Sequence, residues 1–177
     1  MDHEPQMQQV EQTINTWLAA LDQMPAMLQL TATQLHDVHA IVDSFSQITL
    51  GGYQRKPATW DDQLVADVMF SRFVLVLEDD EKTAKLYQMI PQALKSLFSY
   101  LGKQGLLPNA QHLIDWVNIN ARGLQDLSNP QLDQFYRDLV AAMRREGVIF
   151  SDRAAVQSFT QQYLEQHPQA GIKLDQE

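Results

Sequence analysis

The sequence contains no cysteine. This absence excludes disulfides, thiolate zinc sites, iron–sulfur clusters and a cysteine nucleophile. Long hydrophobic runs are also missing: the longest spans only residues 73–77, whereas a membrane-spanning helix needs about 20 residues. The first residues carry neither the basic nor the apolar segment typical of a signal peptide. We therefore expect a cytoplasmic protein with no membrane partner.

Positive charge is scarce as well. The chain has 13 Lys and Arg against 22 Asp and Glu, which gives a formal net charge of −9. Such an excess of negative charge argues against broad nucleic-acid binding. Residues 1–81 hold 3 basic and 13 acidic residues, whereas residues 82–177 hold 10 and 9. This asymmetry fits docking onto a basic partner or mimicry of a nucleic acid, but solubility with acids placed at helix starts explains it better, since no block of like charges exceeds four residues.

Apolar residues recur at helical spacing through almost the whole chain, and no hairpin turn or strand pair is visible. With 177 residues, 45% of them hydrophobic, the chain can bury one sizeable core. We predict an all-α bundle of about seven to eight helices in a single domain over residues 1–168, followed by a flexible tail over 169–177. The segment 50–58 is the clearest loop, and it fits either a long connection or a hinge between two helical subdomains.

Residues 60–78 are apolar on nearly every side, which is typical of a helix at the centre of a domain. Thr59 can cap this helix, because Thr is a favoured residue at the position before a helix. By the same reasoning Asn109 is expected to cap a later helix, and Ser151 or Asp152 the last one.

Two segments of the C-terminal half echo each other. Each consists of a helix, a glycine, two aliphatic residues, a cap and a second helix, and the two glycines, Gly105 and Gly147, are 42 residues apart. Glycine in the left-handed conformation ends a helix, and the aliphatic pair packs back onto it. The spacing lies in the range of helical repeats, so helix-turn-helix repeat-like packing is one interpretation. The other is the general similarity of any two helical corners.

One candidate site could hold a metal ion. His36, His39 and Asp43 share a helical face at spacings of three and four residues, and two imidazoles with a carboxylate are ligands for zinc or iron. The structural alternative is that His39 pairs with Asp43 one turn further on. No second helix supplies the Glu-x-x-His motif of di-iron bundles.

Aromatic and basic residues give two further candidates. A ligand pocket between helices could be lined by large rings, although core packing explains the same residues: Trp60, Phe73 and Trp116. A phosphate-binding patch could form from the one basic cluster of the chain, although acidic residues lie among its members: Arg137, Arg144, Arg145 and Arg153.

The C-terminal third resembles a helical region found in uncharacterised bacterial proteins. The resemblance rests on Phe98-Ser99-Tyr100-Leu101, on Arg145-Glu146-Gly147-Val148-Ile149 and on Val156-Gln157-Ser158-Phe159, and it extends over roughly residues 60–165. Some of those proteins carry a SEC-C-type zinc tail or sit beside a plasmid pRiA4b-type module. The zinc tail has no counterpart in this cysteine-free chain. The resemblance implies a bacterial helical domain that accompanies other modules, and it carries over no function.

The sequence is thus rich in apolar residues. It contains no motif for a phosphate-binding loop, a nucleophile elbow or a His-Glu-x-x-His zinc site. Our leading hypothesis is a non-enzymatic interaction or scaffold module that binds a protein partner or a second copy of itself, without a cofactor. The first alternative is a small-molecule sensor with a pocket between helices. The second is a metal-dependent enzyme that uses His36 and His39.

Overall fold

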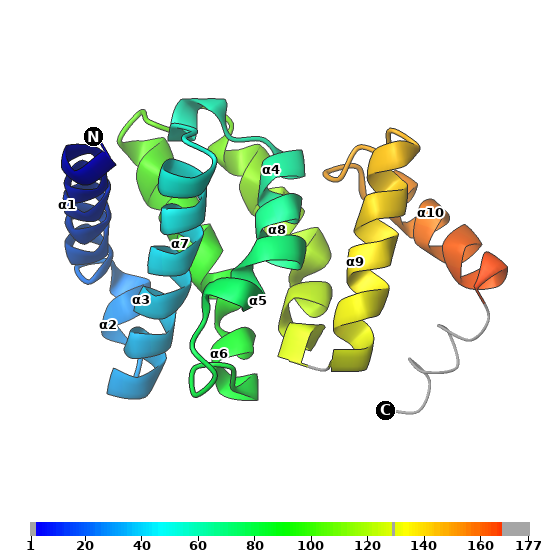
Figure 1. Ribbon diagram of the computed structural model, residues 1–177, viewed down its shortest axis with the longest axis horizontal. Coiled ribbons are helices and arrows are strands. Elements are labelled where there is room, and N and C mark those ends of the chain that lie inside the picture. The colour runs from blue at the N-terminus through cyan, green and yellow to red at the C-terminus, as the bar shows by residue number, and fades with distance from the viewer. Residues whose placement is uncertain (1–2, 129, 168–177) are drawn as a thin grey trace.

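The computed structural model describes residues 3–128 and 130–167, and throughout that part the ordered elements are helices, with no strand (Figure 1). The predicted all-α bundle is therefore confirmed. The α-helical segments are α1 His3–Leu21, α2 Pro25–Leu28, α3 Ala32–Ser46, α4 Asp62–Asp67, α5 Phe73–Val76, α6 Ala84–Gln88, α7 Ile90–Lys103, α8 Ala110–Gln125, α9 Pro130–Arg145 and α10 Arg153–Gln166. The π- and 3-10-helical segments are η1 Gln47–Gly52, η2 Pro57–Thr59, η3 Val68–Arg72 and η4 Asp126–Ser128. The expected tail over 169–177 lies outside the described residues.

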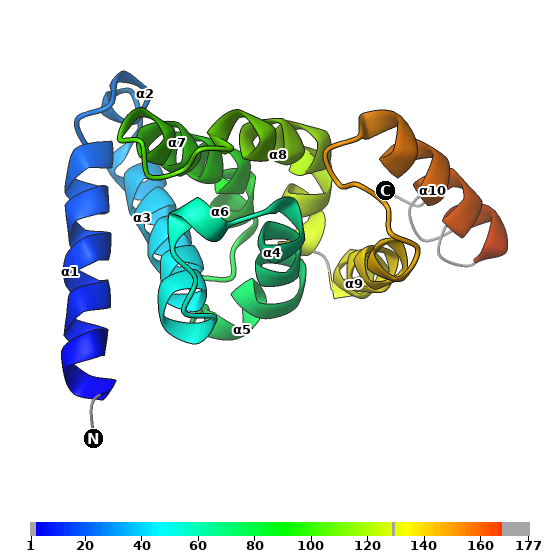
Figure 2. The same ribbon diagram turned by 90° about the horizontal axis from the view of Figure 1, so that it is seen from above.

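The helices are arrayed along the longest axis of the molecule, although not in strict chain order, because α7 lies beside α3 (Figures 1 and 2). The N-terminal helix α1 forms one end and α10 forms the other. Between them α3 packs on α7, α7 packs extensively on α8, and α9 packs on η3 and η4. The last helix is attached mainly through a small contact with α9. Both terminal helices therefore keep large parts of their surface free of neighbours.

One hydrophobic core runs through the molecule and joins both sides of the 50–58 segment. At its centre Trp60 makes edge-to-face contacts with three other rings, with centroid distances of 6.2 Å to Trp17, 5.3 Å to Phe45 and 6.3 Å to Phe98. Edge-to-face pairs stabilise a core beyond the area they bury. Since these rings come from segments before and after residues 50–58, that segment connects parts of a shared core.

The central helix over residues 60–78 differs from the regular helix expected there. It consists of α4, the π-helical η3 and α5, and the Phe73 amide donates to the Val68 carbonyl five residues back. A second π-helical segment, η1, continues α3, and there the Tyr53 amide donates to the Ile48 carbonyl at 2.8 Å. Wider turns of this kind leave carbonyls without an i+4 donor. In η1 the Thr49 hydroxyl, which donates to the Phe45 carbonyl at 3.0 Å, supplies one such donor.

The two π-helical segments are tied to each other and to α9 by a polar cluster. The Tyr53 hydroxyl donates to Asp67, and the Arg72 guanidinium lies over the Tyr53 ring, 5.9 Å from its centroid. Asp67 also accepts from Arg144 of α9 at 3.1 Å. Burial and the adjacent Asp67 carboxylate raise the pKa of the Tyr53 phenol. The neutral phenol is therefore the form that the folded protein favours.

This raised pKa predicts a loss of stability in alkaline solution. The folded state holds the Tyr53 proton more tightly than the unfolded chain, whose pKa is near 10.0, so its contribution is complete below pH 10 and falls as the pH rises through the higher folded-state pKa. At pH 8, Tyr53→Phe should lower the free energy of unfolding by about 1–2 kcal/mol, since it removes a hydrogen bond to a carboxylate. Thermal unfolding at pH 8 to 11.5 should show this deficit shrinking above pH 10. A deficit that stays constant over the whole range would contradict the assignment.

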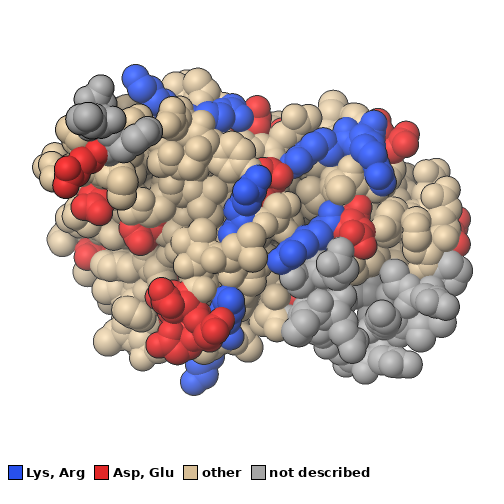
Figure 3. Space-filling view, viewed as in Figure 1, with Lys and Arg blue, Asp and Glu red and all other residues tan. Residues whose placement is uncertain are grey.

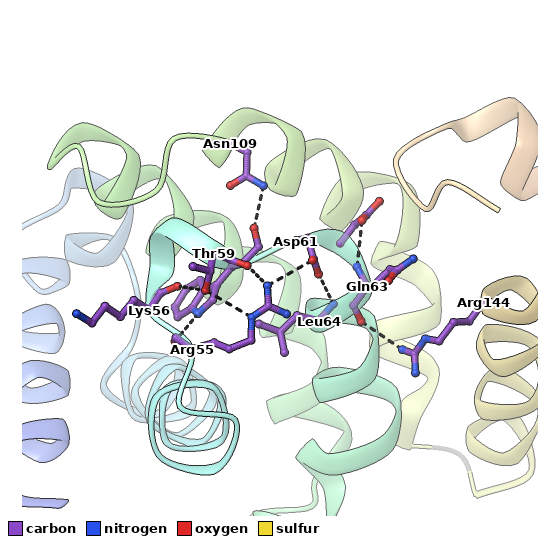
Figure 4. A network of polar contacts seen from close by, with 10 residues as sticks. Arg55, Lys56, Thr59, Asp61, Gln63, Leu64, Asn109 and Arg144 are labelled. Carbon is purple, nitrogen blue, oxygen red and sulfur yellow. Dashed lines mark hydrogen bonds and ion pairs between the residues drawn. The ribbon is translucent and has the colours of Figure 1, made fainter. Parts of the chain in front are cut away.

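The helix caps differ in part from those expected (Figure 4). Thr59 does not cap the central helix, because η2 forms there and the Thr59 hydroxyl donates to the Lys56 carbonyl at 2.8 Å. Asp61 takes the role and accepts from the Leu64 amide at 2.8 Å. Asn109 occupies the N-cap position of α8, but its side chain donates to the Trp60 carbonyl at 2.9 Å. Of the two expected caps of the last helix, Ser151 and Asp152, it is Asp152 that caps α10, accepting from the Ala155 amide.

The two glycine corners have the same local geometry. Gly105 and Gly147 have φ values of 71° and 70°. After each glycine an amide closes back onto the helix, Leu106 onto the Leu101 carbonyl at 2.9 Å and Val148 onto the Met143 carbonyl at 3.0 Å. The predicted left-handed glycine at each corner is thus confirmed.

The helices that leave the two corners nevertheless pack differently. At the first corner a Cβ placed on Gly102 would lie 2.6 Å from the Ala110 Cβ. The helices α7 and α8 therefore come closer there than any residue with a side chain would allow. The position 42 residues later is Arg144, whose guanidinium binds Asp67. In contrast to the extensive packing of α8 on α7, α10 makes only a small contact with α9. The second corner therefore opens, and a groove forms beside it.

Candidate binding groove between the last three helices

The open corner creates a groove of about 510 Å³, which we call the C-terminal groove. Its walls are the facing surfaces of α8, α9 and α10, and part of its floor comes from η3. The lining residues are Phe70, Asn118, Ile119, Asn120, Arg122, Gly123, Leu139, Val140, Met143, Arg153, Val156, Gln157, Thr160, Gln161 and Leu164. This size lies within the range of about 300–1,000 Å³ that is usual for ligand sites.

The groove combines an apolar floor with a polar rim. Leu139, Val140 and Met143 of α9 meet Val156 of α10 at the floor, and each of these side chains is more than nine-tenths buried. A methionine at such a position adapts its shape to different occupants. Amide and hydroxyl groups from α8 and α10 line the edges, where they offer donors and acceptors to a bound chain.

The charge of the groove is opposite to that of the whole protein. Among the residues whose side chains the structure describes, only Arg122 and Arg153 bring charge to its lining, although the chain carries a net charge of −9. Arg122 is 90% exposed and pairs with Asp126 only at 3.7 Å, which leaves its guanidinium available to a ligand. Figure 3 shows basic side chains gathered over the α4 and α9 side of the molecule, with a separate acidic group near α6.

The helix that forms the outer wall is held by an aromatic seam. Tyr163 of α10 contacts Phe135 of α9 with centroids 5.9 Å apart, and it stacks on Phe159 and His167 at 6.4 and 4.1 Å. Burial and the nearby Asp138 raise the pKa of the Tyr163 phenol, while Arg145 opposes this shift. The seam fixes one edge of α10 and leaves its groove-facing edge uncovered.

The predicted basic cluster is divided by the structure. Arg144 binds the Asp67 carboxylate and donates to the Gln63 carbonyl at 3.2 Å, so its charge is already compensated (Figure 4). Arg153 lines the C-terminal groove, whereas Arg137 and Arg145 are not among its lining residues. Of the four arginines predicted to form a phosphate patch, only Arg153 therefore reaches the candidate site.

The predicted metal ligands are directed to different partners. His39 Nε2 lies 2.5 Å from Asp22 Oδ1, at the end of α1, rather than pairing with Asp43. Burial raises the Asp43 pKa, which a hydrogen bond from Gln47 partly offsets. His36 lines a separate recess of about 280 Å³. Within residues 3–128 and 130–167, no group of three or more His, Asp or Glu side chains is placed to hold a metal ion.

The three predicted pocket aromatics are core residues. Trp60 is 2% exposed, and Phe73 and Trp116 are fully buried. They do not share one wall, because Trp60 belongs to the ring cluster around Phe45, Phe73 contacts Tyr87, and Trp116 contacts Phe70. None of the three lines the C-terminal groove. Trp116 is connected to it only through Phe70, which contacts the Trp116 ring and forms part of the groove floor.

Sequence reasoning missed most of the polar rim of the groove. Arg122, Asn118, Gln157 and Thr160 come from two helices, and only the opening of the Gly147 corner brings them together. No local signal identifies them, because Asn118, Arg122 and Gln157 are exposed polar residues like many others on helix surfaces.

No protein-family model matches the chain, and neither the curated proteins nor the solved structures include one that is significantly similar to it. None of the helices in the described part of the chain has the length and apolarity needed to cross a membrane. Function is therefore inferred from the geometry and chemistry of the groove.

Proposed function

We propose that this protein is a binding module, and that its C-terminal groove takes a short, acidic, amphipathic helix from a partner protein. The observation that carries the proposal is an apolar floor flanked by Arg122 and Arg153, with no acidic side chain among the described lining residues, in a chain of net charge −9. An occupant with an apolar face and carboxylates at its edges complements both features.

The dimensions of the groove suit such a segment. Its α10 wall extends from Arg153 to Leu164, about 16 Å at 1.5 Å per residue, which matches about three turns of a bound helix. Recognition of a helix in a groove uses apolar anchors at spacings of three and four residues. The floor residues of α9 offer contacts to such anchors, and the two arginines would set the direction of the bound helix.

The experiment uses a designed peptide, because the natural partner is not identified. The probe is a fluorescein-labelled helical 14-mer with leucines on one face and glutamates elsewhere, and a second peptide carries lysines in place of the glutamates. Fluorescence anisotropy should show binding of the acidic peptide that weakens as salt rises, and at least tenfold weaker binding of the basic peptide. Equal binding of both peptides, or none at millimolar protein, would overturn the proposal.

Two substitutions locate the binding on the protein. Gln157→Trp places a bulky ring in the groove and should weaken binding of the acidic peptide at least tenfold, and Arg153→Glu should do the same through charge. Gln162→Trp introduces the same ring on α10 away from the lining residues, so this variant should bind as the unmodified protein does.

A small apolar anion is the second candidate occupant, since the groove volume of about 510 Å³ is also ordinary for small-molecule sites. The probe for this alternative is 8-anilinonaphthalene-1-sulfonate, whose fluorescence rises in apolar surroundings. Saturable binding that Gln157→Trp abolishes and Gln162→Trp preserves, together with no peptide binding, would favour a small-molecule sensor over the helix-binding module.

A further inference from the structure

One wall of the C-terminal groove ends where the described part of the chain stops. Leu164 is the last residue of α10 that lines the groove, and the helix ends two residues later, at Gln166. His167, at the C-cap position, has a φ of −128° and a ψ of 67°, so the chain has left the helical conformation there. The residues that follow His167 in the sequence therefore start beside one end of the groove.

The sequence of residues 168–177 falls into two parts. Pro168 cannot continue α10, because its ring removes a backbone donor, and Gly171 adopts turn conformations at little steric cost. Ile172 and Leu174 then alternate with charged residues, which is the pattern of an extended segment with one apolar side. The first part thus suits a change of direction and the second part suits a contact with an apolar surface.

The second part, residues 172–177, which we call the tail segment, matches the groove in length. An extended chain advances about 3.3 Å per residue, so the segment spans about 17 Å. The α10 wall from Arg153 to Leu164 also measures about 16 Å. Residues 168–171 are enough for the chain to reverse, since a β-turn needs four residues. A segment that enters beside Leu164 therefore reaches Arg153 with its last residues.

The apolar side of the tail segment has a matching surface in the groove. Ile119 of α8 and Leu164 of α10 are half-buried on the two facing walls, above a floor that includes Val156. Ile172 and Leu174 lie on the same side of an extended chain, because side chains two residues apart point the same way. Both can then cover the apolar surface between the walls.

The charges of the tail segment fit the same direction. Asp175 and Glu177 belong to its second half and would lie close to Arg153, whereas Lys173 would lie at the entrance, about 13 Å before Glu177 in an extended chain. Arg153 is exposed, and no ion pair of its guanidinium occurs within residues 3–128 and 130–167. The acidic end of the segment and this basic end of the groove are therefore complementary.

We propose that the tail segment of this chain occupies the C-terminal groove and competes there with the acidic helix of a partner. This inference rests on the proposed function, because it concerns the regulation of the same site. A short connection holds the segment at an effective concentration in the millimolar range, so a contact that is weak between separate molecules closes the groove. A partner must then displace the segment, and its apparent affinity falls with the fraction of open grooves.

Binding of the acidic 14-mer to full-length variants gives the first test. Ile172→Ser/Leu174→Ser removes the apolar side of the tail segment and should bind the peptide at least threefold more tightly than the unmodified protein. Gln169→Ser/Ala170→Ser changes two residues that precede the segment and should bind as the unmodified protein does. Equal affinity of all three proteins would overturn this inference and leave the binding module in place.

Disulfide trapping tests the position of the tail segment without any partner. The chain contains no cysteine, so Gln176→Cys combined with Gln157→Cys can form only one intramolecular disulfide. In the proposed register position 176 lies beside position 157, and oxidised glutathione should close this bond at least fivefold faster than the bond of Gln176→Cys combined with Gln162→Cys. Gln162 is exposed on α10 away from the groove lining and is nearer in the sequence, so an undocked segment would close that loop at least as fast.

The two tests separate this inference from the proposed function. If the 14-mer bound none of the proteins, the proposed function would fail, and the disulfide rates alone would decide whether the tail segment lies in the groove. Equal rates for the two cysteine pairs would overturn the inference. A disulfide that joined two chains, detected by mass spectrometry under non-reducing conditions, would place the segment in the groove of a second copy and would also overturn it.

Discussion

Replacing Trp60 with alanine is expected to lower the free energy of unfolding by about 3–5 kcal/mol, enough to reduce the melting temperature by roughly 10 °C or more. Trp60 is 2% exposed and sits among Trp17, Phe45 and Phe98. Its removal leaves a cavity that these three rings cannot fill without leaving their edge-to-face positions. The substitution also deprives the Arg55 carbonyl of its indole donor.

The measurement is urea unfolding followed by far-UV circular dichroism, with linear extrapolation to water. Trp60→Phe serves as the matched variant, because it retains a ring in the cluster while losing the indole donor. The decrease in the free energy of unfolding caused by Trp60→Phe should be clearly smaller than the decrease caused by Trp60→Ala. If Trp60→Ala lost less than about 1 kcal/mol, the ring cluster would not be the centre of the core, and the ligand-pocket interpretation of Trp60 would regain weight.

The behaviour of Trp60 illustrates what apolar spacing can predict. Periodicity identified it as a residue of an apolar face, and that inference is confirmed by its burial. Periodicity cannot tell a core aromatic from one that lines a pocket, because both face inward. The distinction depends on whether neighbouring helices close over the ring, and the closing residues are Phe45 and Phe98, far away in the sequence.

Local sequence signals predicted the helix ends more successfully than they predicted contacts between residues distant in the sequence. The left-handed Gly105 and Gly147 and the Asp152 cap depend on neighbouring residues and were identified from the sequence. The partner of His39 depends on how α1 meets α3, and Asp22 rather than Asp43 takes that place. The π-helical segments likewise depend on tertiary contacts, such as the hydrogen bond from the Tyr53 hydroxyl to Asp67. No local sequence pattern predicts such a contact.

The same distinction explains why the candidate groove was only partly foreseen. Arg153 was singled out through its place in a basic cluster, but its neighbour in the groove, Arg122, lies on another helix. The groove exists because α10 does not pack on α9 as α8 packs on α7. We expect this difference to depend on the close approach that Gly102 allows, since the corresponding position of the second corner is Arg144, and the role of Gly102 can be tested directly.

Gly102→Ala is expected to destabilise the protein by about 1–3 kcal/mol, and Gly102→Arg by more. On an exposed helix position, changing glycine to alanine stabilises by about 1 kcal/mol because the unfolded chain loses freedom. At position 102 the new Cβ would lie 2.6 Å from the Ala110 Cβ. This steric clash turns the usual stabilisation by alanine into a destabilisation. Arginine reproduces the side chain of the open corner and should force α8 away from α7.

Gly52→Ala is the matched control, since nothing lies within 4 Å of a Cβ at that position and its φ is not in the left-handed range. It should leave the free energy of unfolding unchanged or slightly higher. Urea unfolding of the three variants under one set of conditions compares them. If Gly102→Ala proved as stable as Gly52→Ala, α7 and α8 could separate at little cost. The residue at the corner would then not be the reason that α10 stands apart, and the opening of the groove would need another cause.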